Sequence, residues 1–184
     1  LFRSKYKKMS ELEHLLHRTD MYVGSIERIS GNVCILDHSN VDKLVMQSKT
    51  IEYCPALLKI IDEAIVNILD HNWRMVTANA KTTKSKMAKA KKAKAMLKQV
   101  HNVRVSVDDE TKEVTIYNDG EGIDIAMHSQ HNVYIPELIF APFRTGTNFD
   151  DTDNKCTGGK NGYGIKLVNA FSTRFEIETV DRRT

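Results

Sequence analysis

The chain contains little cysteine, and its cysteines are far apart. Cys34, Cys54 and Cys156 are the only three, and no two of them form a C-x-x-C pair. An odd number of distant cysteines argues against a disulfide framework and a zinc site, and it favours reduced thiols in an intracellular compartment. No apolar run approaches the length that spans a bilayer, and the amino terminus lacks a signal-peptide pattern. Secreted and membrane-spanning classes are therefore not expected.

Several catalytic signatures are also absent. The glycine-rich segment 158–164 lacks the G-K-[ST] ending of a P-loop, and it does not open the first helix of a βαβ unit as a dinucleotide fingerprint does. The pairs His14 with His17 and His128 with His131 do not fit H-E-x-x-H, so we interpret them as structural or surface residues. No Ser-His-Asp or Cys-His arrangement can be argued from the sequence.

What is present is the composition of an ordinary globular domain. The 184 residues are 41% hydrophobic and 28% charged, and the formal net charge is +3. A chain of this length fits one domain with a real hydrophobic core. Because it begins at Leu1 without a methionine, we expect it to be a piece of a longer protein.

The pattern of apolar residues predicts helices and hairpin-connected strands. Ser10 and Glu13 fit a capping box at the start of a short helix, and Pro55 suits the first position of a longer one. Segregated helices and strands indicate an α+β fold with two layers. The expected helices cover 55–72, 135–140 and 165–171, the expected strands cover 33–36, 44–46, 103–107, 114–117 and 174–180, and 144–164 is expected to be a mobile loop.

The helix expected at 55–72 is apolar on most of its surface, yet it carries one polar stripe. Glu63, Asn67 and Asp70 follow each other at spacings that place them on one helical face. A carboxylate and an amide oxygen on one face suit Mg²⁺, and a carboxylate beside a metal-bound phosphate is placed to act as a general base toward water. The alternative is that the stripe is simply the solvent-exposed face of an amphipathic helix.

Two glycine-containing turns follow. The segment 118–122 comes directly after the expected hairpin, where glycine lets the backbone approach a ligand or adopt positive φ, although an ordinary turn is the simpler interpretation. Gly159, Gly162 and Gly164 precede an apolar helix, whose first backbone N–H groups predict an anion site. Lys166 lies in the first turn of that helix, where its charge opposes the helix macrodipole unless an anion is bound. Such glycine patterns are also common in loops without a ligand.

The three motifs in this order resemble the GHKL ATP-binding fold, and the chain is similar to the amino-terminal ATPase region of eukaryotic-type type II DNA topoisomerases. The resemblance extends over nearly the whole chain and implies a two-layer sandwich with helices on a mixed, largely antiparallel sheet, the Bergerat fold. The resemblance implies that 1–9 is the amino-terminal strap and 144–164 the ATP lid, and that the lysine-rich 76–101 is an insertion relative to the family. The segments that carry the resemblance are 12–16, 22–25, 55–72, 134–140, 157–166 and 171–173.

The resemblance also implies roles for individual residues. Glu63 resembles the general base for attack of water on the γ-phosphate, Asn67 the Mg²⁺ ligand and Asn118 the residue that recognises adenine. Tyr6 resembles the strap tyrosine that reaches the nucleotide of the partner subunit. Thr147 and Asn148 stand where the family contacts ribose and phosphate. The other nucleotide-binding positions are Asp70, Gly122, Ile123, Gly159, Lys160, Asn161, Gly162, Tyr163, Gly164 and Lys166, and those from Lys160 to Lys166 look like the phosphate-binding lid.

The function that the resemblance implies is an ATP gate. Binding of Mg²⁺-ATP would order the lid and dimerise two such domains around a DNA segment, and hydrolysis would reopen the gate. Asp124 stands where the family often has proline, Lys160 stands where arginine is more usual, and 141–146 departs from the usual sequence. The family completes its site with a lysine from a transducer domain that is not in this chain, so we expect nucleotide binding with little hydrolysis.

A lysine-rich segment lies between the apolar helix and the hairpin. No acidic residue occurs between Met75 and Val107, and lysines are interleaved with alanines from 81 to 98. Alanine and lysine favour helix, but a short segment with like-charge neighbours is marginal in isolation. We expect a mobile loop or frayed helix that orders on a polyanion, and contact with double-stranded DNA is the functional interpretation. A solubilising loop and a nuclear-localisation signal are the alternatives.

Two other functional interpretations stay open. One is a GHKL ATP clamp of chaperone or chromatin-scaffold type that does not cleave DNA. The other is a basic DNA-binding domain with a degenerate nucleotide site, whose DNA binding would be indifferent to ATP. An intracellular protein, either nuclear or encoded by a large DNA virus, fits the sequence.

Overall fold

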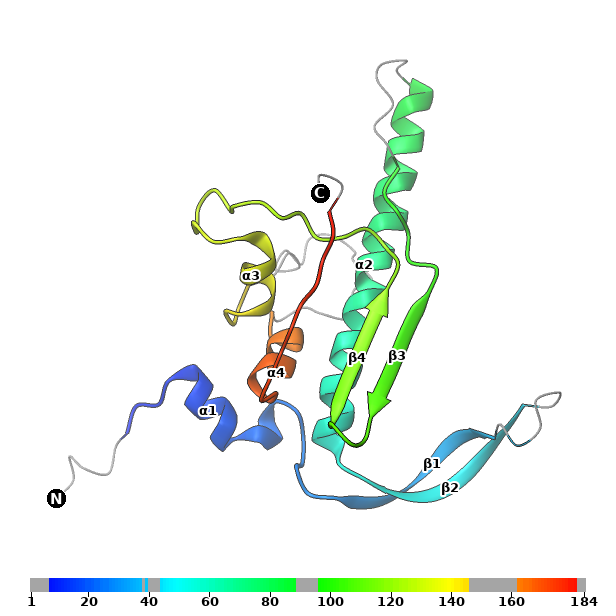
Figure 1. Cartoon of the computed structure of the whole chain (residues 1–184), viewed down its shortest axis with the longest axis vertical. Helices are drawn as coiled ribbons and strands as arrows, with labels where there is room; N and C mark the ends of the chain where they lie inside the picture. The colour runs from blue at the N-terminus through cyan, green and yellow to red at the C-terminus, as the bar shows by residue number, and fades with distance from the viewer. Residues whose placement is uncertain (1–6, 38, 40–43, 89–95, 146–161, 182–184) are drawn as a thin grey trace. The chain divides into compact units, whose positions relative to one another are not determined.

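The computed structural model describes residues 7–37, 39, 44–88, 96–145 and 162–181 (Figure 1). The chain divides into two compact units, Leu1–Ile61 and Asp62–Thr184. In chain order the elements are α1 (Glu11–His17), the 3-10 helix η1 (Thr19–Met21), β1 (Ile29–Asp37), β2 (Val45–Tyr53), α2 (Pro55–Ala88), β3 (Val103–Asp108), β4 (Glu113–Asn118), α3 (Ile135–Phe140) and α4 (Gly164–Ala170).

In the first unit, α1 begins at the predicted capping box. The Ser10 hydroxyl accepts a hydrogen bond from the Glu13 amide at 3.3 Å, and the Glu13 carboxylate accepts one from the Ser10 amide at 2.7 Å. These reciprocal bonds satisfy two amides, one of them among the donors that a helix start leaves unpaired. Leu15 is completely buried, and the His14 ring is hydrogen-bonded to the Tyr22 hydroxyl at 2.9 Å. Local capping and one buried leucine therefore fix this short helix.

The strands β1 and β2 form an antiparallel hairpin that is longer than the apolar runs from which it was predicted. The register pairs all nine residues of each strand. Two polar pairs connect the strands: Thr50 Oγ1 donates to Asn32 Oδ1, and Gln47 Nε2 donates to Asp37 Oδ2, both at 2.5 Å. Because cross-strand polar pairs also stabilise a sheet, the ladder continues beyond its apolar residues.

The helix α2 is 34 residues long and ends at Ala88. The predicted end at Asn72 was wrong, and the helix continues into the first part of the lysine-rich insertion. Residues that extend an existing helix need no new nucleation step, and alanine and lysine have high helix propensity. A segment that would be marginal as an isolated helix is therefore helical where it continues α2. Residues 89–95 of the insertion lie outside the described residues.

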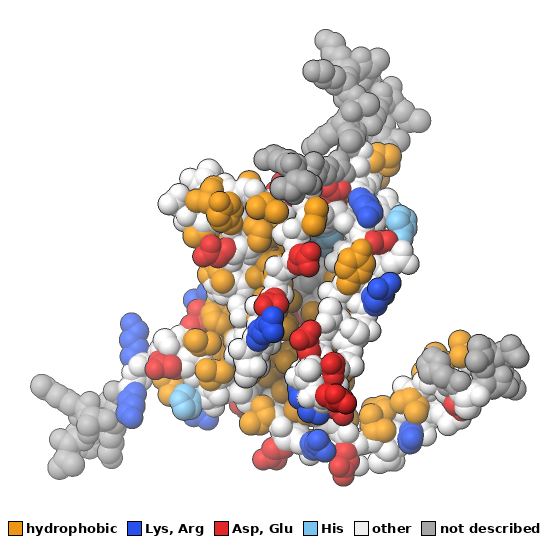
Figure 2. All heavy atoms as spheres, in the orientation of Figure 1, with side chains coloured by type: hydrophobic (Ala, Val, Ile, Leu, Met, Phe, Trp, Pro, Cys, Tyr) orange, Lys and Arg blue, Asp and Glu red, His pale blue; other side chains and the backbone are white. Residues whose placement is uncertain are grey.

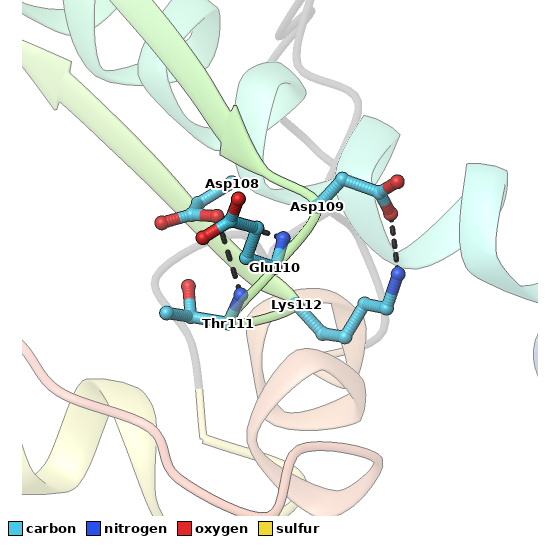
Figure 3. Close-up of polar contacts among 5 residues, drawn as sticks. All are labelled: Asp108, Asp109, Glu110, Thr111 and Lys112. Atoms are coloured by element: carbon cyan, nitrogen blue, oxygen red, sulfur yellow. Dashed lines mark hydrogen bonds and ion pairs between the residues drawn. The ribbon is translucent and has the colours of Figure 1, made fainter.

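In the second unit, β3 and β4 form the predicted antiparallel hairpin, with all six residues of each strand paired. In the turn between them, Asp108 Oδ1 accepts hydrogen bonds from the Thr111 amide at 3.2 Å and the Glu110 amide at 2.9 Å (Figure 3). These bonds lower the pKa of the Asp108 carboxyl from its usual value. Lys112, with φ of 58°, completes the turn and pairs with Asp109 at 2.5 Å.

The helix α3 covers the predicted range, and α4 begins one residue earlier than predicted. The Asn169 side chain of α4 donates to the Phe140 carbonyl at the end of α3, at 3.2 Å. Leu167 of α4 is buried. Of the predicted lid, residues 146–161 lie outside the described part of the chain.

The segment 174–180 does not form a strand, so the predicted closing strand was wrong. Its contacts with residues 123–125 are made by side chains. Thr179 Oγ1 accepts a hydrogen bond from the Ile123 amide at 2.9 Å, and Asp181 Oδ2 accepts one from the Ile125 amide at 3.0 Å. Because side chains occupy these amides, they do not pair with backbone carbonyls of the segment as they would in a ladder.

The α+β class is confirmed, since the structure combines helices with antiparallel strands. One face of the β3–β4 hairpin is apolar, and Val103, Val105 and Val107 on it are 44%, 44% and 68% exposed. Figure 2 shows apolar side chains on the visible surface. Within the described ranges, no helix has both the length and the apolar character of a membrane span.

Candidate functional site

The predicted polar stripe lies on the part of α2 that belongs to the second unit. Asp70 is buried, and Glu63 and Asn67 are half-buried. The Asn67 side-chain amide donates to the Glu63 carbonyl one turn earlier, at 2.6 Å. This bond engages the nitrogen of the amide, so the Oδ1 atom is the one that can coordinate a cation. A stripe that is at least half-buried is not a simple solvent-exposed face.

The glycine motif meets this stripe at Gly164, the first residue of α4. A Cβ atom added to Gly164 would lie 2.3 Å from Glu63 Oε2 and 3.5 Å from Asn67 Nδ2. The Glu63 carboxylate and the Asn67 amide, which were predicted to act together, therefore lie around the position that a side chain at the start of α4 would take. Two motifs far apart in the sequence form one site, and this site has a carboxylate, an amide and half-buried glycine backbone.

The residues next to Gly164 are held by residues 143–145, which follow α3. The Tyr163 ring stacks on Phe143 with centroids 5.6 Å apart, and the Tyr163 hydroxyl accepts a hydrogen bond from Arg144 Nε at 2.9 Å. Lys166 is 5% exposed, and its ammonium group donates to the Thr145 carbonyl. Burial lowers the pKa of Lys166 from its usual value. The Thr145 carbonyl thus accepts a hydrogen bond from Lys166, the lysine whose charge opposes the macrodipole of α4.

The turn after β4 needs its glycines for packing within the chain. A Cβ atom on Gly120 would lie 2.5 Å from Val100 Cγ2, and one on Gly122 would lie 1.9 Å from the Val180 carbonyl oxygen. Neither glycine has positive φ. Asn118 Oδ1 accepts a hydrogen bond from the Gly120 amide at 3.1 Å, which folds the predicted adenine-recognising side chain back onto its own turn. Close approach of chain segments, rather than φ, explains both glycines.

Sequence reasoning missed two residues that support this turn. His71 Nε2 is hydrogen-bonded to the Glu121 carbonyl at 2.6 Å, which joins α2 directly to the turn. Asp119 Oδ1 accepts hydrogen bonds from the His101 amide at 2.8 Å and the Asn102 amide at 2.9 Å. His71 could have been noticed in the sequence, because it lies four residues after Asn67 and so one turn further along the helix.

The His71 contact predicts a dependence of stability on pH. Burial lowers the pKa of the imidazole, the hydrogen bond to Glu121 partly opposes this, and Arg74 adds to it. A histidine whose pKa is lowered by folding contributes stability that is fully present above its unfolded pKa of about 6.5 and is lost as the pH falls below it. Between pH 7 and pH 5 the Tm should fall more in the wild type than in His71→Gln, measured by circular dichroism. An equal fall in both proteins contradicts this prediction.

The donor set fits Mg²⁺ only as an ion held jointly with phosphate. The described residues contain no group of three or more His, Cys, Asp or Glu side chains that could hold a metal ion. Mg²⁺ commonly takes one or two protein ligands and completes its coordination with water and substrate phosphates. Asn67, whose Nδ2 atom lies 3.5 Å from the position of a Cβ on Gly164, can offer its Oδ1 atom as that single protein ligand. The predicted positions Tyr6, Thr147, Asn148, Gly159, Lys160 and Asn161 lie outside the described residues.

Comparisons with known proteins identify relatives in sequence and fold. The family model described as histidine kinase-, DNA gyrase B-, and HSP90-like ATPase matches residues 54–183. DNA topoisomerase 2 of Acanthamoeba polyphaga mimivirus is 40% identical over 178 residues, which are 96% of this chain and 12% of that protein. DNA topoisomerase 2 of Penicillium chrysogenum is 39% identical over 179 residues, which are 97% of this chain and 10% of that protein.

A solved structure is similar over the same range. The crystal structure of the ATPase region of Saccharomyces cerevisiae topoisomerase II matches with a TM-score of 0.70 and 37% identity, over 93% of this chain and 39% of that one. The chain thus spans only 12% and 10% of the length of the two curated relatives described above. The identity and the TM-score together support the similarity in both sequence and fold.

Proposed function

The chain belongs to the family of histidine kinase-, DNA gyrase B- and HSP90-like ATPases, and on this premise we propose that it is the ATP-binding gate module of a type II DNA topoisomerase. The single observation that carries the proposal is that Gly164 has the Glu63 carboxylate and the Asn67 amide around the position where a Cβ atom would lie. It supports a site in which the phosphate-binding backbone, the metal ligand and the general base are neighbours. The similarity to DNA topoisomerase 2 supports strand passage as the work that the gate performs.

In the proposed mechanism each motif has one task. Asn118 recognises adenine, and the backbone of 162–164 lies against the phosphates. Asn67 Oδ1 holds Mg²⁺, which when bound neutralises charge on the phosphate oxygens. Thr147 and Asn148 contact ribose and phosphate. The proposed nucleotide-binding set is completed by Asp70, Gly122, Ile123, Gly159, Lys160, Asn161, Tyr163 and Lys166.

Glu63 is proposed as the general base. Its carboxylate removes a proton from water as the water oxygen bonds to the γ-phosphorus, and the bond from that phosphorus to the β–γ bridging oxygen breaks. The products are ADP and inorganic phosphate, and the proton stays on Glu63 until solvent removes it. A general base must lie within hydrogen-bond reach of the water that it activates, and the place of the Glu63 carboxylate next to Gly164 supports this role.

The partners of the gate are also proposals. Two copies dimerise when ATP binds, Tyr6 of each reaches the nucleotide of the other, and double-stranded DNA passes through the closed pair. The basic insertion at 76–101 contacts DNA by counterion release. The protein works inside a cell, in the nucleus or, if a virus encodes it, in the infected host.

A DNA relaxation assay on the longer protein tests the proposed function. We expect supercoiled plasmid to be relaxed when Mg²⁺ and ATP are present, and not when ATP is omitted. ATP hydrolysis without any change in plasmid topology would contradict the proposal and would favour an ATP clamp of the chaperone or chromatin-scaffold type. DNA binding that is indifferent to ATP, without hydrolysis, would favour a degenerate site.

A further inference from the structure

The segment 97–102, which contains the last residues of the lysine-rich insertion and leads into β3, is held by α2. Asn79 is 4% exposed, and its side chain makes a pair of bonds with the Leu97 backbone: Nδ2 donates to the carbonyl, and Oδ1 accepts from the amide, both at 2.8 Å. The Val100 amide donates to Asn72 Oδ1 at 2.9 Å. The side chains of two asparagines on α2 therefore form hydrogen bonds with backbone groups of 97–102, which in a sheet would pair with the backbone of a neighbouring strand.

The same segment is held by the turn at 118–122. The Asp119 carboxylate accepts three hydrogen bonds, from the amides of His101 and Asn102 and from the Asn102 side chain at 2.8 Å. These bonds lower the pKa of the Asp119 carboxyl, so that it is ionised at neutral pH and is a strong acceptor. Glu121 adds a reciprocal pair: its carboxylate accepts from the Lys98 amide at 2.8 Å, and its own amide donates to the Lys98 carbonyl at 2.9 Å.

Packing adds a steric contact between the segment and the turn. The Val100 side chain occupies the space next to Gly120, so that even a methyl group on this glycine would clash with it. The Gly120 amide in turn donates to Asn118 Oδ1. Val100 and Gly120 therefore connect 97–102 to the side chain proposed to recognise adenine.

We propose that 97–102 is a strut that positions the adenine-recognising turn relative to α2, with Asn79 and Asp119 as its positioning residues. This inference rests on the proposed function, because it concerns the base-recognising side of the same site. Asn79 fixes the strut to the helix that carries Glu63 and Asn67, and Asp119 fixes it to the turn that carries Asn118. The strut sets the distance between the phosphate side and the adenine side, and so governs how well one nucleotide fits both.

The test compares a ligand that has a base with one that lacks it. The wild type, Asn79→Ala, Asp119→Ala and Asp119→Asn are titrated by calorimetry with AMP-PNP and, separately, with inorganic tripolyphosphate, both with Mg²⁺. We expect Asn79→Ala and Asp119→Ala to weaken AMP-PNP binding by about tenfold and tripolyphosphate binding by less than about twofold. Asp119→Asn keeps one acceptor oxygen, so it should rescue most of the loss. Asp109→Ala, an exposed carboxylate on the β3–β4 turn, is the matched control.

The outcomes separate the two proposals. Equal loss of both ligands indicates a merely structural role and overturns the strut, as does unchanged AMP-PNP binding in both alanine variants. Because Asn79 is buried, circular dichroism checks that its variant is folded. If that variant is not folded, the variants of Asp119, which is only half-buried, test the proposal. A folded wild type that binds neither ligand contradicts the proposed function itself and the strut with it.

Discussion

Replacing Glu63 by glutamine should lower the rate of ATP hydrolysis by the longer protein by about 10²–10⁴-fold, while AMP-PNP affinity stays within about threefold of the wild type. Glutamine keeps the size of the side chain beside Gly164 and can accept a hydrogen bond, but it cannot take the proton from water. Binding depends on other groups, so its free energy should change little. Phosphate release at saturating ATP and calorimetric titration measure the two quantities.

A neighbouring carboxylate provides the matched control for this prediction. Asp62 precedes Glu63 on the same helix but is exposed, so Asp62→Asn should hydrolyse ATP at the wild-type rate. If Glu63→Gln retains more than about a tenth of the wild-type hydrolysis rate, Glu63 is not the general base. A loss of the same size in Asp62→Asn would show that the effect comes from charge on the helix rather than from proton transfer.

Gly164→Ala should have a similarly large effect on hydrolysis with little effect on folding. The added Cβ would lie 2.3 Å from Glu63 Oε2, and the end of a glutamate side chain can swing away at low cost. The fold therefore tolerates the methyl group, but the general base is displaced from the phosphates. We expect the hydrolysis rate to fall at least about 100-fold and the Tm to stay within a few degrees of the wild type.

Two comparisons make this prediction specific. Gly122→Ala places its Cβ 1.9 Å from a backbone carbonyl oxygen that cannot swing away, so it should destabilise folding by about 1–3 kcal/mol. The double variant of Glu63→Gln and Gly164→Ala should be no slower than the slower single variant, because both remove the same function. Additive losses in the double variant, or a Gly164→Ala protein as unstable as Gly122→Ala, would contradict the assignment.

Local signals in the sequence predicted most of the elements. The capping box at Ser10, the proline at Pro55 and the alternation in the β3–β4 hairpin each act within a few residues, and the structure confirms the elements that they predict. The wrong predictions concern segments whose secondary structure depends on contacts with the rest of the chain. The end of α2 was predicted too early because propensity was judged for an isolated segment, and 174–180 was predicted as a strand although side chains make its contacts.

The sequence predicted which motifs belong to the site, but it did not predict how these motifs are arranged in space. Spacing alone placed Glu63, Asn67 and Asp70 on one helical face, and the family resemblance assigned their roles. That Gly164 lies next to two of them depends on how the start of α4 is placed against α2, which no local pattern encodes. The support for the adenine-recognising turn was missed for the same reason. Its hydrogen bonds join Asn79 to Leu97 and Asp119 to His101, residues about 18 positions apart along the chain.

The most direct test of the account is a calorimetric titration of AMP-PNP into this chain, with and without Mg²⁺, alongside Asn67→Ala. Circular dichroism of both proteins shows that they are folded. The account predicts saturable binding that requires Mg²⁺ and is at least about tenfold weaker in Asn67→Ala. Binding by the folded wild type that is indifferent to Mg²⁺ and unchanged in Asn67→Ala would contradict the site described on α2, and folded protein without any binding would contradict nucleotide binding by this chain.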